Sequence, residues 1–152
     1  MATSYNTIHN LFLKKVSDYD LPQLEELTQE RVVMGYLDSA IARTWRILTQ
    51  IDFTKRDEPM QFSGDLDAGF EDDFDMDSLD ILTEWMVFFW LEPYQNNLDL
   101  LRVALSTKDF SITSPANLLD KITNRFELCR KHAISIMNQY SFRISDIERL
   151  RP

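Results

Sequence analysis

The stretch SLDILTEWMVFFWL, residues 78–91, decides the fold expected for this chain of 152 residues. Its apolar side chains wrap around a helix on every side instead of forming one stripe. A helix of this kind must be covered by other elements or by a second subunit. Ser78 is the expected N-cap, and Pro93 is expected to lie in the first turn of the next helix. The sequence therefore predicts a central helix over residues 79–91.

Two amphipathic helices are expected before this central helix. The first covers residues 4–15, with Thr3 or Ser4 as its N-cap. The second covers residues 29–48, where apolar side chains recur at steps of three and four. This recurrence places Trp45 on the buried stripe of the second helix.

The longest helix is expected after a dipeptide that starts helices. Ser114 and Pro115 pair an N-cap serine with a proline at the first helical position. An apolar stripe then continues to Tyr140 and includes Cys129, where a buried thiol serves packing. A shorter helix with its stripe over residues 98–105 is expected to come before this long one.

Residues 49–77 have a different pattern. Short alternating runs at residues 51–53 and 60–62 permit a small hairpin, and an acidic loop follows as far as Asp77. Part of that loop matches the acidic spacing of a calcium-binding loop, but Ser78 stands where the calcium loop needs glycine. The sequence therefore predicts acids that face water or a cationic partner, and it predicts no calcium site.

Together these patterns predict an all-α protein, a helical bundle of four to five helices with an acidic loop or small hairpin. One domain is expected over residues 1–140, followed by a C-terminal arm over residues 141–152. The only cysteine excludes an internal disulfide, and no apolar run reaches the roughly 18 residues of a membrane span.

Groups for catalysis are few. His9 and His132 lie in different predicted helices, without a nearby serine or acid in a catalytic motif. Only three glycines are present, too few for a glycine-rich phosphate loop. We therefore expect no enzymatic activity, no catalytic residue, no metal and no cofactor.

Charge is distributed unevenly along the chain. Residues 1–120 carry nine basic and 22 acidic side chains, whereas residues 121–152 carry seven basic and three acidic ones. An acidic body does not favour general binding to nucleic acid, because phosphates need a basic face. A negative body with a positive end suits head-to-tail association of identical copies, although chance partition between solvated faces gives the same pattern.

The C-terminal arm combines apolar and basic side chains. Four large apolar residues would favour aggregation if they were exposed, so the arm is expected either to fold back on the bundle or to insert into a partner. The apolar residues are Phe142, Ile144, Ile147 and Leu150, and the basic residues are Arg143, Arg149 and Arg151.

The order of these features resembles the small neck proteins of tailed bacteriophages, the head–tail connector or adaptor family. The resemblance covers most of the chain in order and character. It is carried by residues 36–41, 51–53, the acidic loop, residues 79–86, 90–93 and 108–110, and the long helix from Ser114 to residues 140–142.

The resemblance implies a structural virion protein that forms a homo-oligomeric ring between the portal and the tail. Its partners would be further copies of itself, the portal protein, and a tail or head-closure protein. DNA would pass through without specific binding, and the ring would be assembled in the host cytoplasm and remain in the virion. Arms of such adaptors insert into the portal. Carried over to this chain, the apolar residues of the arm would anchor it and its three arginines would pair with carboxylates.

Two alternatives remain open from the sequence. Another structural protein of the phage tail or baseplate would have similar sequence features. A small acidic phage protein that binds and inhibits a host protein is the other alternative, and the acidic run at residues 65–84 motivates it.

Overall fold

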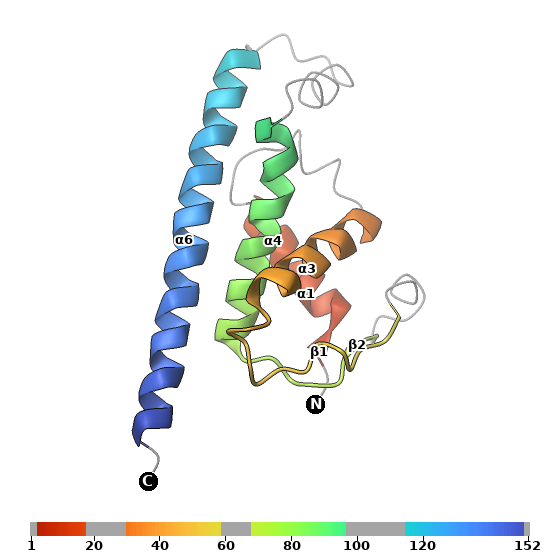
Figure 1. Ribbon diagram of the computed structural model, residues 1–152. Helices are drawn as coiled ribbons and strands as arrows, with labels where there is room; N and C mark the ends of the chain where they lie inside the picture. The colour runs from red at the N-terminus through yellow and green to blue at the C-terminus, as the bar shows by residue number, and fades with distance from the viewer. Residues whose placement is uncertain (1–2, 18–29, 59–67, 97–114, 151–152) are drawn as a thin grey trace.

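The computed structural model describes residues 3–17, 30–58, 68–96 and 115–150 (Figure 1). These residues form four helices and one two-stranded sheet, which confirms the predicted all-α helical bundle. In chain order the elements are β1 (Thr3–Ser4), α1 (Tyr5–Ser17), α3 (Glu30–Thr44), β2 (Gly69–Phe70), α4 (Met76–Asn96) and α6 (Pro115–Leu150).

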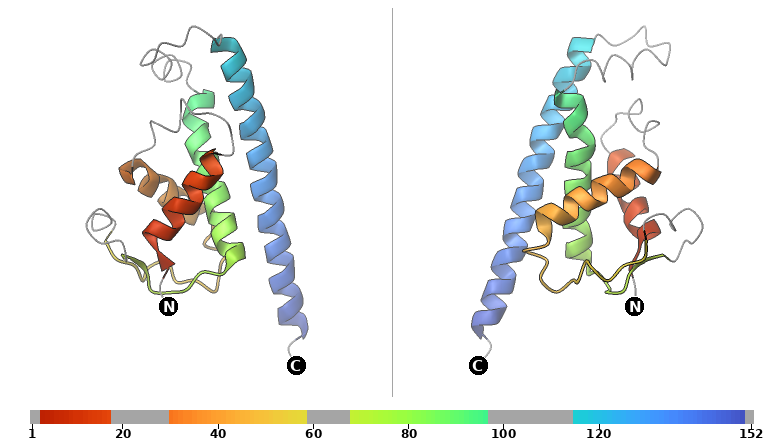
Figure 2. Two further views of the ribbon diagram at one scale, coloured as in Figure 1. Left: turned by 180° about the vertical axis from the view of Figure 1, so that it is seen from behind. Right: turned by 45° about the vertical axis from the view of Figure 1, so that its right-hand side comes forward.

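Helix α4 is the centre of the bundle. Helices α1, α3 and α6 all pack against it, and α6 lies alongside it in every view (Figures 1 and 2). From Ser78 to Leu91, every side chain is buried except those of Asp80 and Phe89, which are partly exposed. The predicted central helix is therefore confirmed, and three neighbouring helices provide its cover.

Both ends of α4 differ from the expectation. Asp75 is the N-cap, because its Oδ1 accepts a hydrogen bond of 2.8 Å from the backbone N–H of Ser78. Ser78 itself is buried in the first turn, so its predicted role as N-cap is wrong. The helix also continues through Pro93 to Asn96. A proline near the end of a helix removes one backbone hydrogen bond without ending the helix at once.

The small sheet joins the start of the chain to its middle. Strands β1 and β2 are antiparallel, with Thr3 opposite Phe70 and Ser4 opposite Gly69. A Cβ atom at residue 69 would lie 2.2 Å from the carbonyl oxygen of Thr3, so this close backbone approach requires glycine.

The predicted hairpin is not formed in the way expected. Residues 51–53 have no strand structure, and residues 60–62 lie outside the described residues. Residues 55–57 instead bridge to β2: Arg56 pairs with Phe70, and the N–H groups of Asp57 and Glu71 donate to the carbonyls of Gly69 and Lys55. In the two-stranded sheet itself, the partner of β2 is the N-terminal strand β1.

The N-terminal helices follow the prediction more closely. Ser4 caps α1, since its Oγ accepts a hydrogen bond of 3.1 Å from the backbone N–H of Thr7. Helix α3 is shorter than expected and ends at Thr44. The Thr44 hydroxyl donates a hydrogen bond to the carbonyl of Ala40 inside the last turn, and Trp45 starts the turn that follows.

Helix α6 begins at Pro115, as predicted, and is longer than predicted. It continues to Leu150, so the expected end at Tyr140 is wrong and residues 141–150 of the predicted arm are helical. The physical reason is that this segment contains neither glycine nor proline, and Ile144 continues the buried stripe one turn beyond Tyr140. The shorter helix predicted over residues 98–105 and the cap at Ser114 lie outside the described residues.

Candidate functional site

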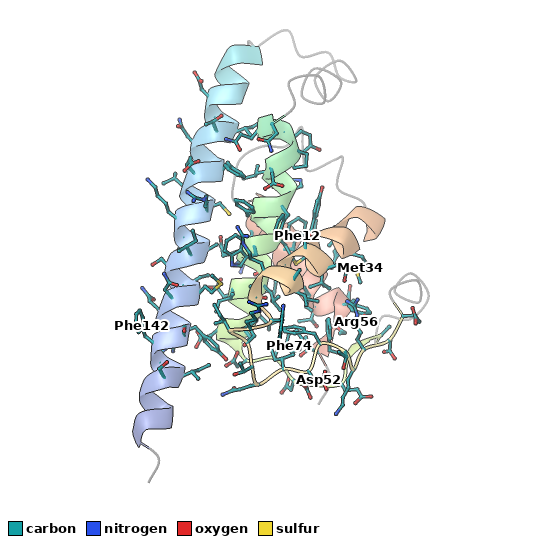
Figure 3. The ribbon with its side chains drawn as sticks, viewed as in Figure 1. Phe12, Met34, Asp52, Arg56, Phe74 and Phe142 are labelled. Atoms are coloured by element: carbon teal, nitrogen blue, oxygen red, sulfur yellow. The ribbon has the colours of Figure 1, made fainter. Side chains whose placement is uncertain are left out.

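The predicted partner-binding residues of the arm separate onto different sides of α6. Phe142 is 71% exposed and projects from the side of α6 turned away from the bundle (Figure 3). Ile144 instead packs, partly buried, against the core. Arg143 also reaches the body, where its Nη2 lies 2.8 Å from Oδ2 of Asp77 at the start of α4.

The remaining residues of this set lie at the end of the chain. Ile147, Arg149 and Leu150 belong to the last turns of α6, and Arg151 lies beyond the described residues. Arg143 and Ile144 therefore contact the bundle from a helix that continues unbroken to Leu150. Phe142 does not contact the bundle, and its side chain is exposed.

A second large apolar side chain is exposed on α6. Leu128 is 60% exposed and precedes Phe142 by 14 residues, or about 21 Å along the helix. Fourteen residues are close to four full turns, so both residues lie on one side of α6. Lys131, Ser135 and Gln139 are exposed between them. We call these five residues the outer face of α6.

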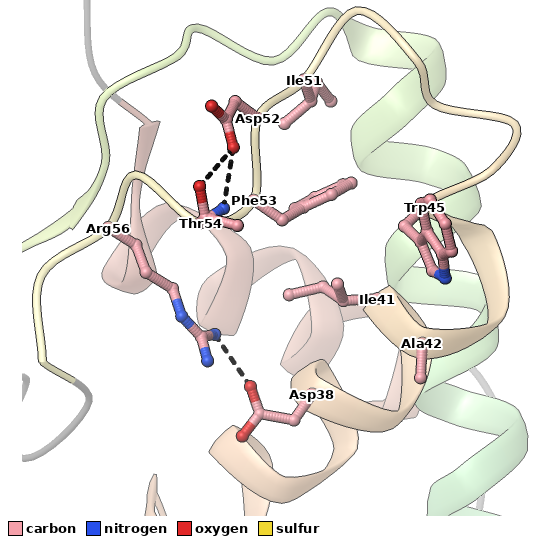
Figure 4. Close-up of a pocket in the computed structure, with 9 residues that line it drawn as sticks. All are labelled: Asp38, Ile41, Ala42, Trp45, Ile51, Asp52, Phe53, Thr54 and Arg56. Atoms are coloured by element: carbon pink, nitrogen blue, oxygen red, sulfur yellow. Dashed lines mark hydrogen bonds and ion pairs between the residues drawn. The ribbon is translucent and has the colours of Figure 1, made fainter.

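An open pocket of about 460 Å³ lies between α3 and the segment that follows it (Figure 4). We call it the Trp45 pocket. Trp45 is 53% exposed, so its predicted place on the buried stripe of the helix is wrong. The backbone N–H of Trp45 still donates a hydrogen bond of 2.9 Å to the Ile41 carbonyl, so the helical spacing holds at this residue, but the bundle does not cover its ring. The lining residues are Asp38, Ile41, Ala42, Trp45, Ile51, Asp52, Phe53, Thr54 and Arg56.

Charged side chains border the apolar floor of the Trp45 pocket. Arg56 and Asp38 form an ion pair, with Nη1 2.8 Å from Oδ1. Asp52 accepts hydrogen bonds from the hydroxyl and the backbone N–H of Thr54, and the hydroxyl bond is the main reason that the pKa of Asp52 is lowered. The Arg46 guanidinium lies over the Trp45 ring, 5.2 Å from its centroid.

A buried carboxylate connects three helices. Glu84 of α4 is 7% exposed. Its Oε1 lies 3.0 Å from Nζ of Lys15 on α1, and its Oε2 lies 3.4 Å from Nδ1 of His132 on α6. The thiol of Cys129, which is buried as predicted, lies 3.5 Å from the Glu84 backbone carbonyl. Lys15 also pairs with Asp80, so the cluster holds α1, α4 and α6 together.

Five of the seven described acids of the acidic run have side-chain partners within the fold. Asp72 accepts a hydrogen bond from the backbone N–H of Asp52, Asp75 caps α4, and Asp77 pairs with Arg143. Asp80 and Glu84 share Lys15. Within the described ranges, no group of three or more histidine, cysteine, aspartate or glutamate side chains is arranged to hold a metal ion.

Sequence reasoning missed the Trp45 pocket and the Glu84 cluster. The pocket forms where residues 51–56 pack near residues 38–45. Periodicity within one helix contains no information on which later segment packs against it. Glu84 ends the acidic run at residues 65–84, and its position between Thr83 and Trp85 in the most apolar stretch is a signal of burial.

Comparison of the chain with known proteins found no matching family model, no similar curated protein and no similar solved structure. No helix in the described part of the chain has the length and apolar character needed to cross a membrane.

Proposed function

We propose that this chain is a structural subunit of the neck of a tailed-bacteriophage virion. As a head–tail connector or adaptor, it would form a homo-oligomeric ring that joins the portal to the tail. The observation that carries the proposal is the shape of α6. This helix has 36 residues and is longer than α4 (Figures 1 and 2). It bears exposed apolar side chains on a face that the bundle leaves uncovered.

The outer face of α6 has the character of an assembly surface. Large apolar side chains that protrude from a polar surface commonly anchor protein partners. Leu128 and Phe142 are two such anchors, and polar residues separate them. A helix of 36 residues is about 54 Å long, so the helix can contact several neighbours in an assembly.

The distribution of charge fits the same role. The acidic residues are concentrated in residues 1–120 and the basic excess is in residues 121–152. Opposite charge at the two parts of the chain favours contact between copies in a head-to-tail arrangement. A ring with an acidic lining would also let DNA slide, because it does not bind phosphates.

The experiment is co-expression of the chain with the portal protein encoded in its genetic neighbourhood. Particles are then examined by electron microscopy, and their mass is measured by light scattering. We expect a ring of this chain on the portal. Phe142→Ala should weaken incorporation, whereas Gln139→Ala, a matched change on the same face, should leave it intact.

Two other results would favour the alternatives. A chain that forms no large assembly, does not bind the portal and binds a host protein would be an acidic inhibitor. A chain that joins a tail or baseplate component and not the portal would be a structural protein of that part. Either result would contradict the connector role.

A further inference from the structure

Two exposed surfaces of the molecule carry opposite charge. One is the outer face of α6, on which Leu128 and Lys131 are neighbours. The other is residues 71–77, which lead into the first turn of α4 and which we call the acidic segment. We propose that the outer face of α6 in one copy docks on the acidic segment of a second copy, an inference that rests on the homo-oligomeric assembly proposed above.

The acidic segment has a strong negative charge. It carries five acidic side chains, and no lysine or arginine occurs from residue 57 to residue 101. Glu71 and Asp73 are exposed, and neither forms an ion pair with another described residue. The backbone carbonyl of Lys55 accepts a hydrogen bond from the N–H of Glu71, but the Lys55 ammonium lies 3.9 Å from the carboxylate of Asp52. Two carboxylates of the segment are therefore available to a cationic partner.

Helix α6 carries the opposite charge. Over residues 120–145 it has five basic and two acidic side chains, a net charge of +3. Glu127 lies 3.9 Å from Arg130, and both side chains are about half exposed. Lys131 is exposed on the outer face and forms no ion pair within the part of the chain that the structure describes. A positive surface with an available ammonium attracts a negative surface with available carboxylates.

Each surface also exposes one large apolar side chain among its charges. Met76 is 75% exposed between Asp75 and Asp77, and Leu128 is 60% exposed one helical turn before Lys131. Methionine is flexible and adapts to the shape of an apolar partner. Contact between Met76 and Leu128 would remove both side chains from water, while the surrounding opposite charges select which surfaces meet.

The acidic segment of one copy does not reach the outer face of the same copy. The segment meets its own α6 at Arg143, which pairs with Asp77. Lys131 lies twelve residues before Arg143, about 18 Å along the helix. The outer face is also turned away from the bundle, as Phe142 shows in Figure 3. A contact between these unlike surfaces therefore joins different copies head to tail, and such contacts close into a ring where the rotation allows it.

Charge reversal tests this contact in the full chain, with self-association measured by sedimentation velocity at low ionic strength. Lys131→Glu and Asp73→Lys should each weaken association at least fivefold, because like charges then meet. An equal mixture of the two variants should regain association, since each variant meets opposite charge on the other at both surfaces. Added salt should weaken association of the original chain, because exposed charges are screened.

Lys14→Glu is the matched control. It makes the same change in net charge as Lys131→Glu, but on an exposed residue of α1, and it should leave association unchanged. Met76→Ser should weaken association, because it removes the apolar side chain at the centre of the acidic segment. Thermal melts of all these variants should match the original chain, since the replaced side chains are exposed, and a loss of association then reports on the contact.

The results separate this inference from the proposed function. Association that neither charge reversal weakens, or a mixture that does not regain it, would overturn the inference, and rings on the portal would still support the connector role. Recovery in the mixture without any binding to the portal would support the inference and contradict the connector role. If copies associate only on the portal, the yield of rings there is compared for the same variants and their mixture. A chain that remains a single copy both alone and with the portal would overturn both proposals.

Discussion

Helices α4 and α6 lie side by side, yet they differ in how the rest of the chain uses them. Helix α4 has three helices around it and is buried on all sides, whereas α6 packs mainly on α4 and leaves its outer face exposed. Helix α4 thus forms the core of the fold, whereas α6 covers one side of that core and leaves its other side available to partners. Changes in α4 should reduce stability, and changes on the outer face of α6 should reduce assembly.

The largest expected effect is Trp85→Ala in α4. This indole is 1% exposed, contacts the ring of Phe88 and lies under the guanidinium of Arg43. Its removal should lower the free energy of unfolding by about 4 kcal/mol, measured by urea denaturation. Trp85→Phe should cost less, since it keeps an aromatic ring and removes an indole N–H without a hydrogen-bond partner in the described structure. A loss below about 1 kcal/mol for Trp85→Ala would show that α4 is not the central helix.

Lys15→Met should have the next largest effect, because it leaves Glu84 buried without its ammonium partner. We expect a loss on the order of 3 kcal/mol, since removal of one partner strands the other charge. The double variant Lys15→Met with Glu84→Gln should recover part of this loss in a double-mutant cycle. Purely additive losses would mean that the two side chains do not interact.

Alkaline pH should reduce stability through Tyr36 of α3. Burial, with a smaller contribution from Tyr94 of α4, raises the pKa of Tyr36 to about 12, against an ordinary value of 10.0. The folded state therefore favours the neutral phenol, and this stabilisation is complete below pH 10 and lost as the pH rises toward 12. Urea denaturation should show a smaller loss with pH in Tyr36→Phe than in the original chain. Equal losses in both proteins would assign the effect to other groups.

Asp75→Ala should cost about 1 kcal/mol, because it removes the N-cap of α4. The comparison with Ser78→Ala distinguishes the two candidate caps. Ser78 is buried in the first turn and does not cap the helix, so its replacement should shift the melting temperature less than Asp75→Ala does. The reverse order would restore Ser78 as the cap.

The smallest effect is expected for Phe142→Ala, which should change stability by less than about 0.5 kcal/mol because the ring is exposed. Ile144→Ala, two residues further along, should cost about 1 kcal/mol because Ile144 is partly buried against the core. Thermal melts of both variants compare the two sides of α6 directly. A similar loss for both would mean that Phe142 also belongs to the core.

Features set by nearby residues could be predicted from the sequence. The cap at Ser4, the start of α6 at Pro115 and the burial of α4 depend on neighbours within a few positions. The N-cap of α4, predicted at Ser78 and observed at Asp75, is an exception. Asp75 and Ser78 are both good caps, and only the backbone shows which N–H is satisfied.

Features that depend on distant segments could not be predicted. Strand β1 pairs with residues almost 70 positions away, and the Trp45 pocket needs the segment after α3 to turn back on that helix. The predicted end of α6 is too early because the apolar stripe is interpreted as ending at Tyr140, although Ile144 continues it. For the candidate site, the sequence indicated Phe142 as a contact residue but did not indicate the Trp45 pocket.

The place of α6 at the end of the chain has a consequence for synthesis on the ribosome. Helix α4 is complete at Asn96, but the stripe that covers one of its sides extends to Tyr140. Synthesis proceeds at roughly 5–20 residues per second, so the α6 stripe is complete only about 2–9 s after α4. During this interval the nascent chain exposes apolar side chains of α4 that can associate with other chains. Slow codons after residue 96 should therefore increase aggregation of newly made protein, while a gene that supplies α6 without delay should improve the soluble yield.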